Sequence, residues 1–148
     1  MAQCGCAVRV LEAVESVTAR GAILVALGCC TSFAYACGES LSSPRIADSA
    51  HYVVAFATAP APIPFNEHFV VEFEVCPRAA GVYDSVRIDA TMPEHRHGMN
   101  YRPAIDRRDG NVYRAQGLLF HMRGRWEIAF EVVTGSDVER LTTSVVLE

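Results

Sequence analysis

The chain has 148 residues and a formal net charge of −4 at pH 7, and all 13 of its basic residues are arginine. This length predicts one domain, and a mildly acidic chain without a basic stripe is not expected to bind nucleic acid. The absence of lysine excludes Schiff-base and phosphate-loop lysine chemistry.

Residues 1–37 are predicted to be a signal peptide or a lipoprotein leader. An apolar run ends in Ala34-Tyr35-Ala36, the small-x-small pattern after which a signal peptidase cuts. The run of about 16 residues is shorter than the ~20 of a spanning helix. Export to the periplasm or the outer side of the cytoplasmic membrane is therefore expected. Cys29 and Cys37 both follow lipobox-like residues, so a lipid anchor at the N-terminus is the possible membrane attachment.

The body of the chain contains a single cysteine, Cys76, because the other five lie in the leader. We predict that Cys76 is a buried, inert thiol. The alternative is a disulfide with Cys37, which requires that Cys37 survives processing and that the compartment is oxidising.

Residues 38–50 are small and polar and are predicted to be a linker, and the pattern from residue 51 onward is that of β-strands. Phe69, Val71 and Phe73 fall on one face of a strand, with Glu72 and Glu74 on the other, which is the period of a half-buried strand. Similar patterns predict strands over residues 51–56, 69–75, 82–91, 112–121, 125–133 and 140–147. No helical pattern follows residue 37.

About six or seven short antiparallel strands separated by turn signals predict an all-β fold, a β-sandwich over residues 51–148. The apolar positions of these strands form the predicted core: Phe69, Val71, Phe73, Val86, Ile88, Leu118, Phe120, Trp126, Ile128, Phe130, Leu141 and Val145.

Histidine and methionine cluster at two places in the body. Met92-Pro93-Glu94-His95-Arg96-His97-Gly98-Met99 contains two of each, and His121-Met122 ends a predicted strand. Imidazole nitrogens and thioether sulfurs are ligands that copper favours, and methionine particularly suits Cu(I). In an extended chain, His95 and His97 point to the same side, and the rim of a sandwich can bring the second pair to the first.

We expect three or four copper ligands from His95, His97, His121 and Met122. Met99 is the next choice and Met92 the last. If His121 points toward the metal, Met122 points away unless the turn after it breaks the strand alternation. His51 and His68 have no such neighbours and are predicted to lie on the surface or on edge strands.

Other chemistries fit less well. A blue-copper site needs a cysteine with two histidines, and Cys76 lacks the closely following His and Met. The spacing of the three histidines resembles that of carbonic-anhydrase zinc, but the body is short and thioethers are unusual beside hydrolytic zinc. No Gly-x-Ser-x-Gly element is present, so no enzyme is predicted. Arginines make the predicted loop over residues 93–111 positively charged. This charge is either simply solvated or serves to bind an acidic partner.

The segment from Phe69 to Val133 resembles the YtkA-like domain family, which is related to FixH-like envelope proteins. The resemblance is carried by Met92-Pro93-x-His95-x-His97-Gly98-Met99 and Phe120-x-Met122-x-Gly124-x-Trp126. It implies an immunoglobulin-like sandwich, export or membrane attachment, and copper handling. It also favours Met122 over His121 as the ligand of the second element.

The expected function is therefore that of an exported copper-binding protein, a metallochaperone or copper-tolerance factor. His95, His97 and Met122 bind the metal, and His121 or Met99 completes the site. The expected recipient is an envelope metalloprotein or oxidase. The alternative is a metal-free accessory module that contacts a partner through the loop from Pro93 to Asn111.

Overall fold

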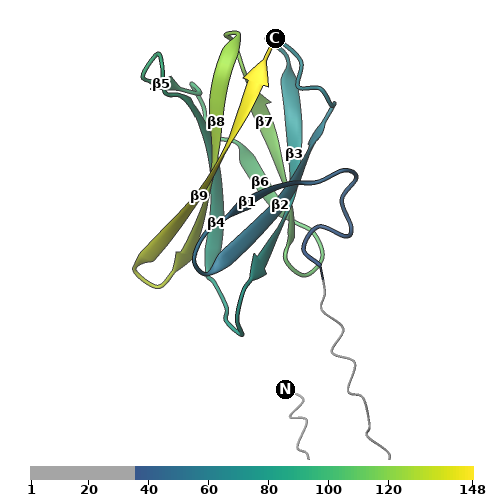
Figure 1. Cartoon of the computed structure of the whole chain (residues 1–148), viewed down its shortest axis with the longest axis vertical. Helices are drawn as coiled ribbons and strands as arrows, with labels where there is room; N and C mark the ends of the chain where they lie inside the picture. Colours follow the sequence, from purple (N-terminus) through teal and green to yellow (C-terminus); the bar gives the residue numbers. More distant parts are fainter. Residues whose placement is uncertain (1–35) are drawn as a thin grey trace, which may run out of the picture. The chain divides into compact units, whose positions relative to one another are not determined.

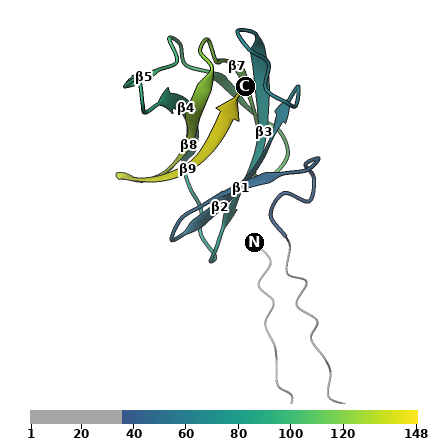
Figure 2. The same cartoon turned by 45° about the horizontal axis from the view of Figure 1, so that its top comes forward.

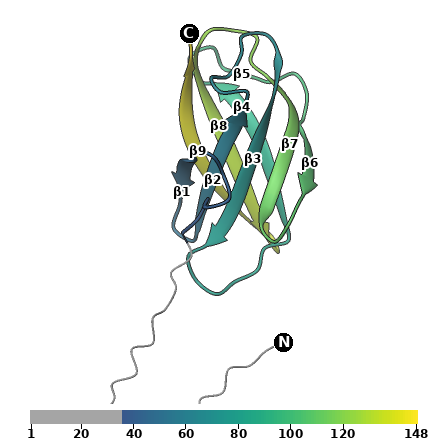
Figure 3. The same cartoon turned by 90° about the vertical axis from the view of Figure 1, so that its right-hand side faces the viewer.

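A computed structural model describes residues 36–148, and the predicted leader up to residue 35 lies outside the described residues. This part of the chain contains nine strands in two antiparallel sheets. The two sheets face each other (Figure 1, Figure 2 and Figure 3). The described residues contain no helix that is long and apolar enough to cross a membrane. The prediction of an all-β sandwich is confirmed.

The two sheets have the strand order of an immunoglobulin domain. The first sheet, in spatial order, contains β1 (Arg45–Asp48), β2 (Tyr52–Ala59), β3 (His68–Pro77), β7 (Val112–Leu119) and β6 (Ala104–Arg107). The second contains β5 (His97–Gly98), β4 (Ser85–Met92), β8 (Gly124–Thr134) and β9 (Asp137–Leu147). Strands β2, β3, β7 and β6 correspond to A, B, E and D of that fold, and β4, β8 and β9 to C, F and G.

The core lies between the sheets, where the alternating apolar side chains of the long strands meet. All twelve residues of the predicted core are buried. In β3, for example, Phe69, Val71 and Phe73 point inward, because successive side chains of a strand point to opposite faces. Trp126 is fully buried and stacks on Phe120, with 4.4 Å between the ring centroids.

Three strands were missed by the sequence prediction because they are too short to show a period. Strands β1, β5 and β6 have 4, 2 and 4 residues and lie at sheet edges. The prediction of a linker over residues 38–50 is wrong for β1, in which Ile46 pairs with Ala55 of β2. Backbone pairing holds this segment although its side chains are mostly exposed.

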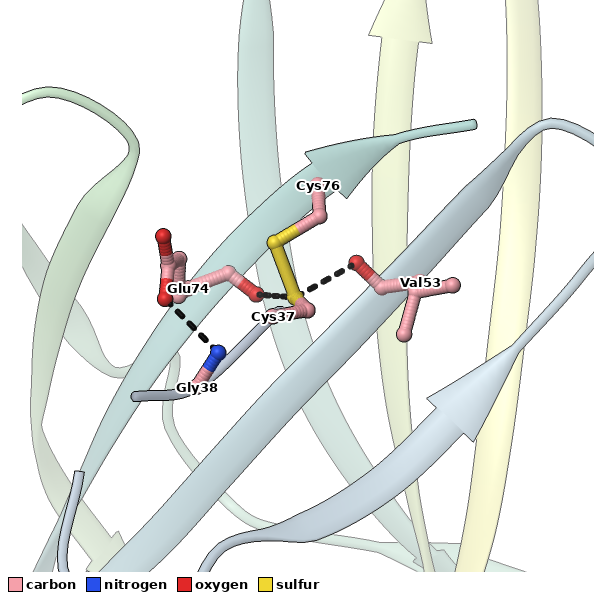
Figure 4. Close-up of a disulfide and its surroundings, with 5 residues drawn as sticks. All are labelled: Cys37, Gly38, Val53, Glu74 and Cys76. Atoms are coloured by element: carbon pink, nitrogen blue, oxygen red, sulfur yellow. Dashed lines mark hydrogen bonds between the residues drawn. A yellow bond between two sulfur atoms is a disulfide. The ribbon is translucent and has the colours of Figure 1, made fainter. Parts of the chain in front are cut away.

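Cys37 and Cys76 form a disulfide (Figure 4), so the preferred prediction of an inert Cys76 thiol is wrong and the alternative is confirmed. The bond attaches the segment before β1 to the outer face of β3. It also covers Glu74, which was predicted to face solvent but is only 6% exposed. The Gly38 N–H donates a hydrogen bond of 2.8 Å to the Glu74 carboxylate. Cys37, assigned to the leader from the sequence, is thus bonded to the sandwich.

Candidate metal centre

Two turns at one end of the sandwich hold the predicted ligands. Residues 93–96 form a turn between β4 and β5, and His97 in β5 pairs with Met92. The connection from β7 to β8 carries His121 and Met122. Figures 1 and 3 show β5 and this connection at the same end of the molecule.

His97 lies at the centre of the cluster. Its Nε2 is 3.2 Å from the sulfur of Met122, and its Nδ1 is 3.3 Å from the backbone oxygen of Gly98. When Nδ1 carries the ring proton and donates it to that carbonyl, the lone pair of Nε2 is directed at the thioether. This is the tautomer that a metal-binding imidazole needs, and a backbone carbonyl commonly selects it.

The other two imidazoles flank His97 at different distances. The ring centroid of His121 is 5.1 Å from that of His97, and the centroid of His95 is 6.1 Å away. His95 is exposed, whereas His97, His121 and Met122 are half-buried. The closest set is therefore His97, His121 and Met122.

Trp126 forms the floor of this cluster. Its ring lies 5.6 Å from the rings of both His97 and His121, edge to face in each case. Its Nε1–H donates a hydrogen bond of 2.9 Å to the backbone oxygen of Met122, which fixes the turn that carries the thioether. The sequence analysis placed Trp126 in the core and in the motif of the family resemblance, but not beside the imidazoles. The Met122-x-x-x-Trp126 spacing was the available signal for this second role.

The spacing of the donor atoms fits a small soft cation. A tetrahedral ion bound at about 2.0 Å to nitrogen and 2.3 Å to sulfur separates these two atoms by roughly 3.5 Å, and places two imidazole centroids about 5 Å apart. The distances from His97 to Met122 and to His121 are 3.2 Å and 5.1 Å.

The structure differs from the sequence prediction in how His95 and His97 are arranged. The chain is not extended at His95 but turns, with Arg96 at a φ of +55°. Within residues 36–148, the group of three His, Cys, Asp or Glu donors that lies within 4.8 Å is Cys37, Glu74 and Cys76, and it does not include the three imidazoles. The clustered site therefore depends on the thioether.

The remaining candidates lie further into the fold or elsewhere. Met92 is buried in the core, and Met99 is half-buried and packs against it. His51 and His68 are exposed, as predicted. Glu94 pairs with Arg125 at 3.0 Å, so its carboxylate is already engaged.

Comparison with known proteins leaves the family open. No protein-family model and no curated protein matches the sequence. Among solved structures, the crystal structure of a DUF4426 family protein from Pseudomonas aeruginosa PAO1 is similar, with a TM-score of 0.44 and 9% identity. The match covers 71% of this chain and 96% of that chain. A similarity this low carries no argument about function, and the resemblance to YtkA-like domains stays a prediction.

Proposed function

We propose that this protein binds one Cu(I) ion at the rim of the sandwich through His97, Met122 and His121. His95 is the outer imidazole, and Met99 is the remaining candidate. The observation that carries the proposal is the 3.2 Å approach of an imidazole nitrogen to a thioether sulfur from residues 25 positions apart in the chain. The same distance fits a hydrogen bond from Nε2–H to the sulfur, so Cu(I) affinity is the property that tests the proposal.

The donor set favours copper over zinc. Thioether is a neutral, soft donor that suits Cu(I), and imidazole binds both copper and zinc, whereas zinc sites in proteins use thiolate, imidazole and carboxylate without thioether. The carboxylate nearest in sequence, Glu94, is paired with Arg125.

The proposed role is to hold and pass on copper, as a metallochaperone or a copper-tolerance factor. Half-buried ligands at a rim, beside an exposed His95, allow a recipient to approach the ion. That recipient is an envelope metalloprotein or oxidase.

The proposed compartment is outside the cytoplasm. The small-x-small pattern that ends at Ala36 supports export, and disulfides persist in oxidising compartments. The disulfide also limits lipid attachment, because Cys37 cannot carry a thioether-linked lipid while its sulfur is bonded to Cys76.

Anaerobic competition between the protein and a Cu(I) chelator tests the proposal. The full chain needs Cys4, Cys6, Cys29 and Cys30 replaced by serine, because their thiols bind Cu(I) themselves. This four-serine protein retains the disulfide. We expect one Cu(I) per chain, accompanied by a change in the fluorescence of Trp126, the single tryptophan.

Substitutions at the cluster give the decisive comparison. Met122→Leu and His97→Ala are expected to weaken Cu(I) binding at least about tenfold, since loss even of a group that supports a ligand costs about 10–100-fold. His68→Ala, an exposed histidine outside the cluster, is the matched control and leaves affinity unchanged. If the parent binds Cu(I) no more tightly than Met122→Leu and His97→Ala do, the proposal is contradicted. In that case the alternative of a metal-free accessory module is favoured. Its contact surface would be the segment from Pro93 to Asn111, which includes Tyr101 (46% exposed).

A further inference from the structure

A second group of donor atoms lies near the end of β3 that is far from His97 and Met122. The sulfurs of Cys37 and Cys76 and a carboxylate oxygen of Glu74 all lie within 4.8 Å of one another (Figure 4). Glu74 and Cys76 are two apart in β3 and share its outer face. Cys37 lies across them from the segment before β1.

Glu74 is an unexpected residue at this position. Burying a carboxylate is costly unless its partners compensate, and the Gly38 N–H is a single neutral donor. A glutamine could accept that hydrogen bond without a buried charge. A cation bound beside the carboxylate would offset its buried negative charge.

Small molecules can approach this group from the surface. A hollow of about 590 Å³ is lined in part by Glu74, Cys76, Asp109 and Asn111. Both cysteines are half-buried rather than enclosed. The hollow gives a reductant or a hydrated cation a route to the disulfide.

We propose that reduction of the Cys37–Cys76 disulfide creates a site for a soft divalent cation such as Zn²⁺ or Cd²⁺. A dithiol supplies two electrons and two protons, becomes a disulfide itself, and leaves two thiols on the protein. The cation then displaces both thiol protons. It is held by the two thiolates and the Glu74 carboxylate, with a water from the hollow as fourth ligand, and thiolate, carboxylate and water are each established zinc ligands. In the oxidised protein the sulfurs are bonded to each other, so redox state controls the site.

Cd²⁺ titration of the four-serine protein tests this proposal, because Cys37 and Cys76 are then its only cysteines. The ultraviolet charge-transfer absorption of Cd²⁺–thiolate bonds is measured anaerobically before and after treatment with a dithiol, which is removed by gel filtration. The absorption is expected in the reduced protein only. Cys76→Ser is expected to abolish it.

Two carboxylate variants separate the proposed site from simple thiol binding. Glu74→Gln is expected to weaken Cd²⁺ binding by at least about tenfold. Asp109→Asn, which lies in the same hollow, changes affinity less than about twofold. The thermal unfolding of oxidised Glu74→Gln shows that it is folded. Absence of the absorption after reduction, or equal affinities of the parent and Glu74→Gln, overturns the proposal. Neither result decides the copper proposal, because the Met122 variants test that proposal separately.

Discussion

Met122 faces His97 because the backbone leaves strand geometry just before it. Strand β7 ends at Leu119 and β8 begins at Gly124, so the residues between them do not alternate as a strand does. His121 and Met122 consequently both approach His97. The sequence left the directions of these two side chains open. Strand alternation alone would have pointed them to opposite faces, and the turn is what brings both toward His97.

Glu139 gives a prediction for the pH dependence of stability. The Ser49 hydroxyl, the backbone N–H of His51 and its imidazole lower the pKa of Glu139 from 4.5 to about 2. A carboxyl group whose pKa is depressed in the folded state stabilises the fold above its unfolded pKa, and that contribution is lost as the pH falls through the folded value.

Glu139→Gln is therefore expected to lower the free energy of unfolding near neutral pH. The gap between the two proteins should close as the pH falls from about 4.5 to about 2. Urea unfolding at a series of pH values measures this difference in unfolding free energy between the two proteins. A gap of constant size over this range would show that the carboxylate charge at Glu139 does not stabilise the fold.

At the scale of elements, alternation predicted the long strands and failed for the short ones. The six predicted strands correspond to β2, β3, β4, β7, β8 and β9, each of 8 or more residues. Strands β1, β5 and β6 are held by backbone pairing with a longer neighbour. A segment of 2 to 4 residues is too short to show an alternating pattern of apolar and polar side chains.

The segment before β1 depends on a close approach at Gly38. Gly38 has a φ of +90°, and a Cβ there would lie 2.5 Å from the Cβ of Ala55. Gly38→Ala is expected to destabilise the oxidised protein by at least about 2 kcal/mol, because backbone strain and overpacking add.

Gly110→Ala is the matched control for this substitution. Gly110 also has a positive φ, +57°, but a Cβ there meets nothing within 4 Å. Gly110→Ala is expected to lower the free energy of unfolding by about 1 kcal/mol, from backbone strain alone. Denaturant unfolding compares the two variants. Equal losses would mean that Gly38 is not packed against β2.

At the scale of the whole molecule, the disulfide joins residues 39 positions apart. Closing a loop of this length is expected to stabilise the fold by about 4 kcal/mol at 25 °C, through the entropy of the unfolded chain. In the four-serine protein, the further change of Cys37 and Cys76 to serine should lower the unfolding free energy by about that amount. Reduction of the unmutated pair should have the same effect. A loss well under 1 kcal/mol would argue that the bond does not form in solution.

The fold class could be predicted from the sequence, but the contacts between distant segments could only be given as alternatives. Buried apolar positions repeat along each strand, so the core residues were identified correctly. The strand pairing within each sheet depends on contacts between segments far apart, on which a local pattern carries no information. The same holds for the choice between a free Cys76 and its disulfide with Cys37. The floor formed by Trp126 under the two imidazoles is a contact of this kind.

X-ray absorption at the copper edge of the four-serine protein, loaded with one Cu(I), tests the central claim most directly. We predict one sulfur at about 2.3 Å and nitrogens at about 2.0 Å. The sulfur should disappear in Met122→Leu and remain in Met99→Leu. A copper environment without sulfur, or one that Met122→Leu leaves unchanged, would contradict the account.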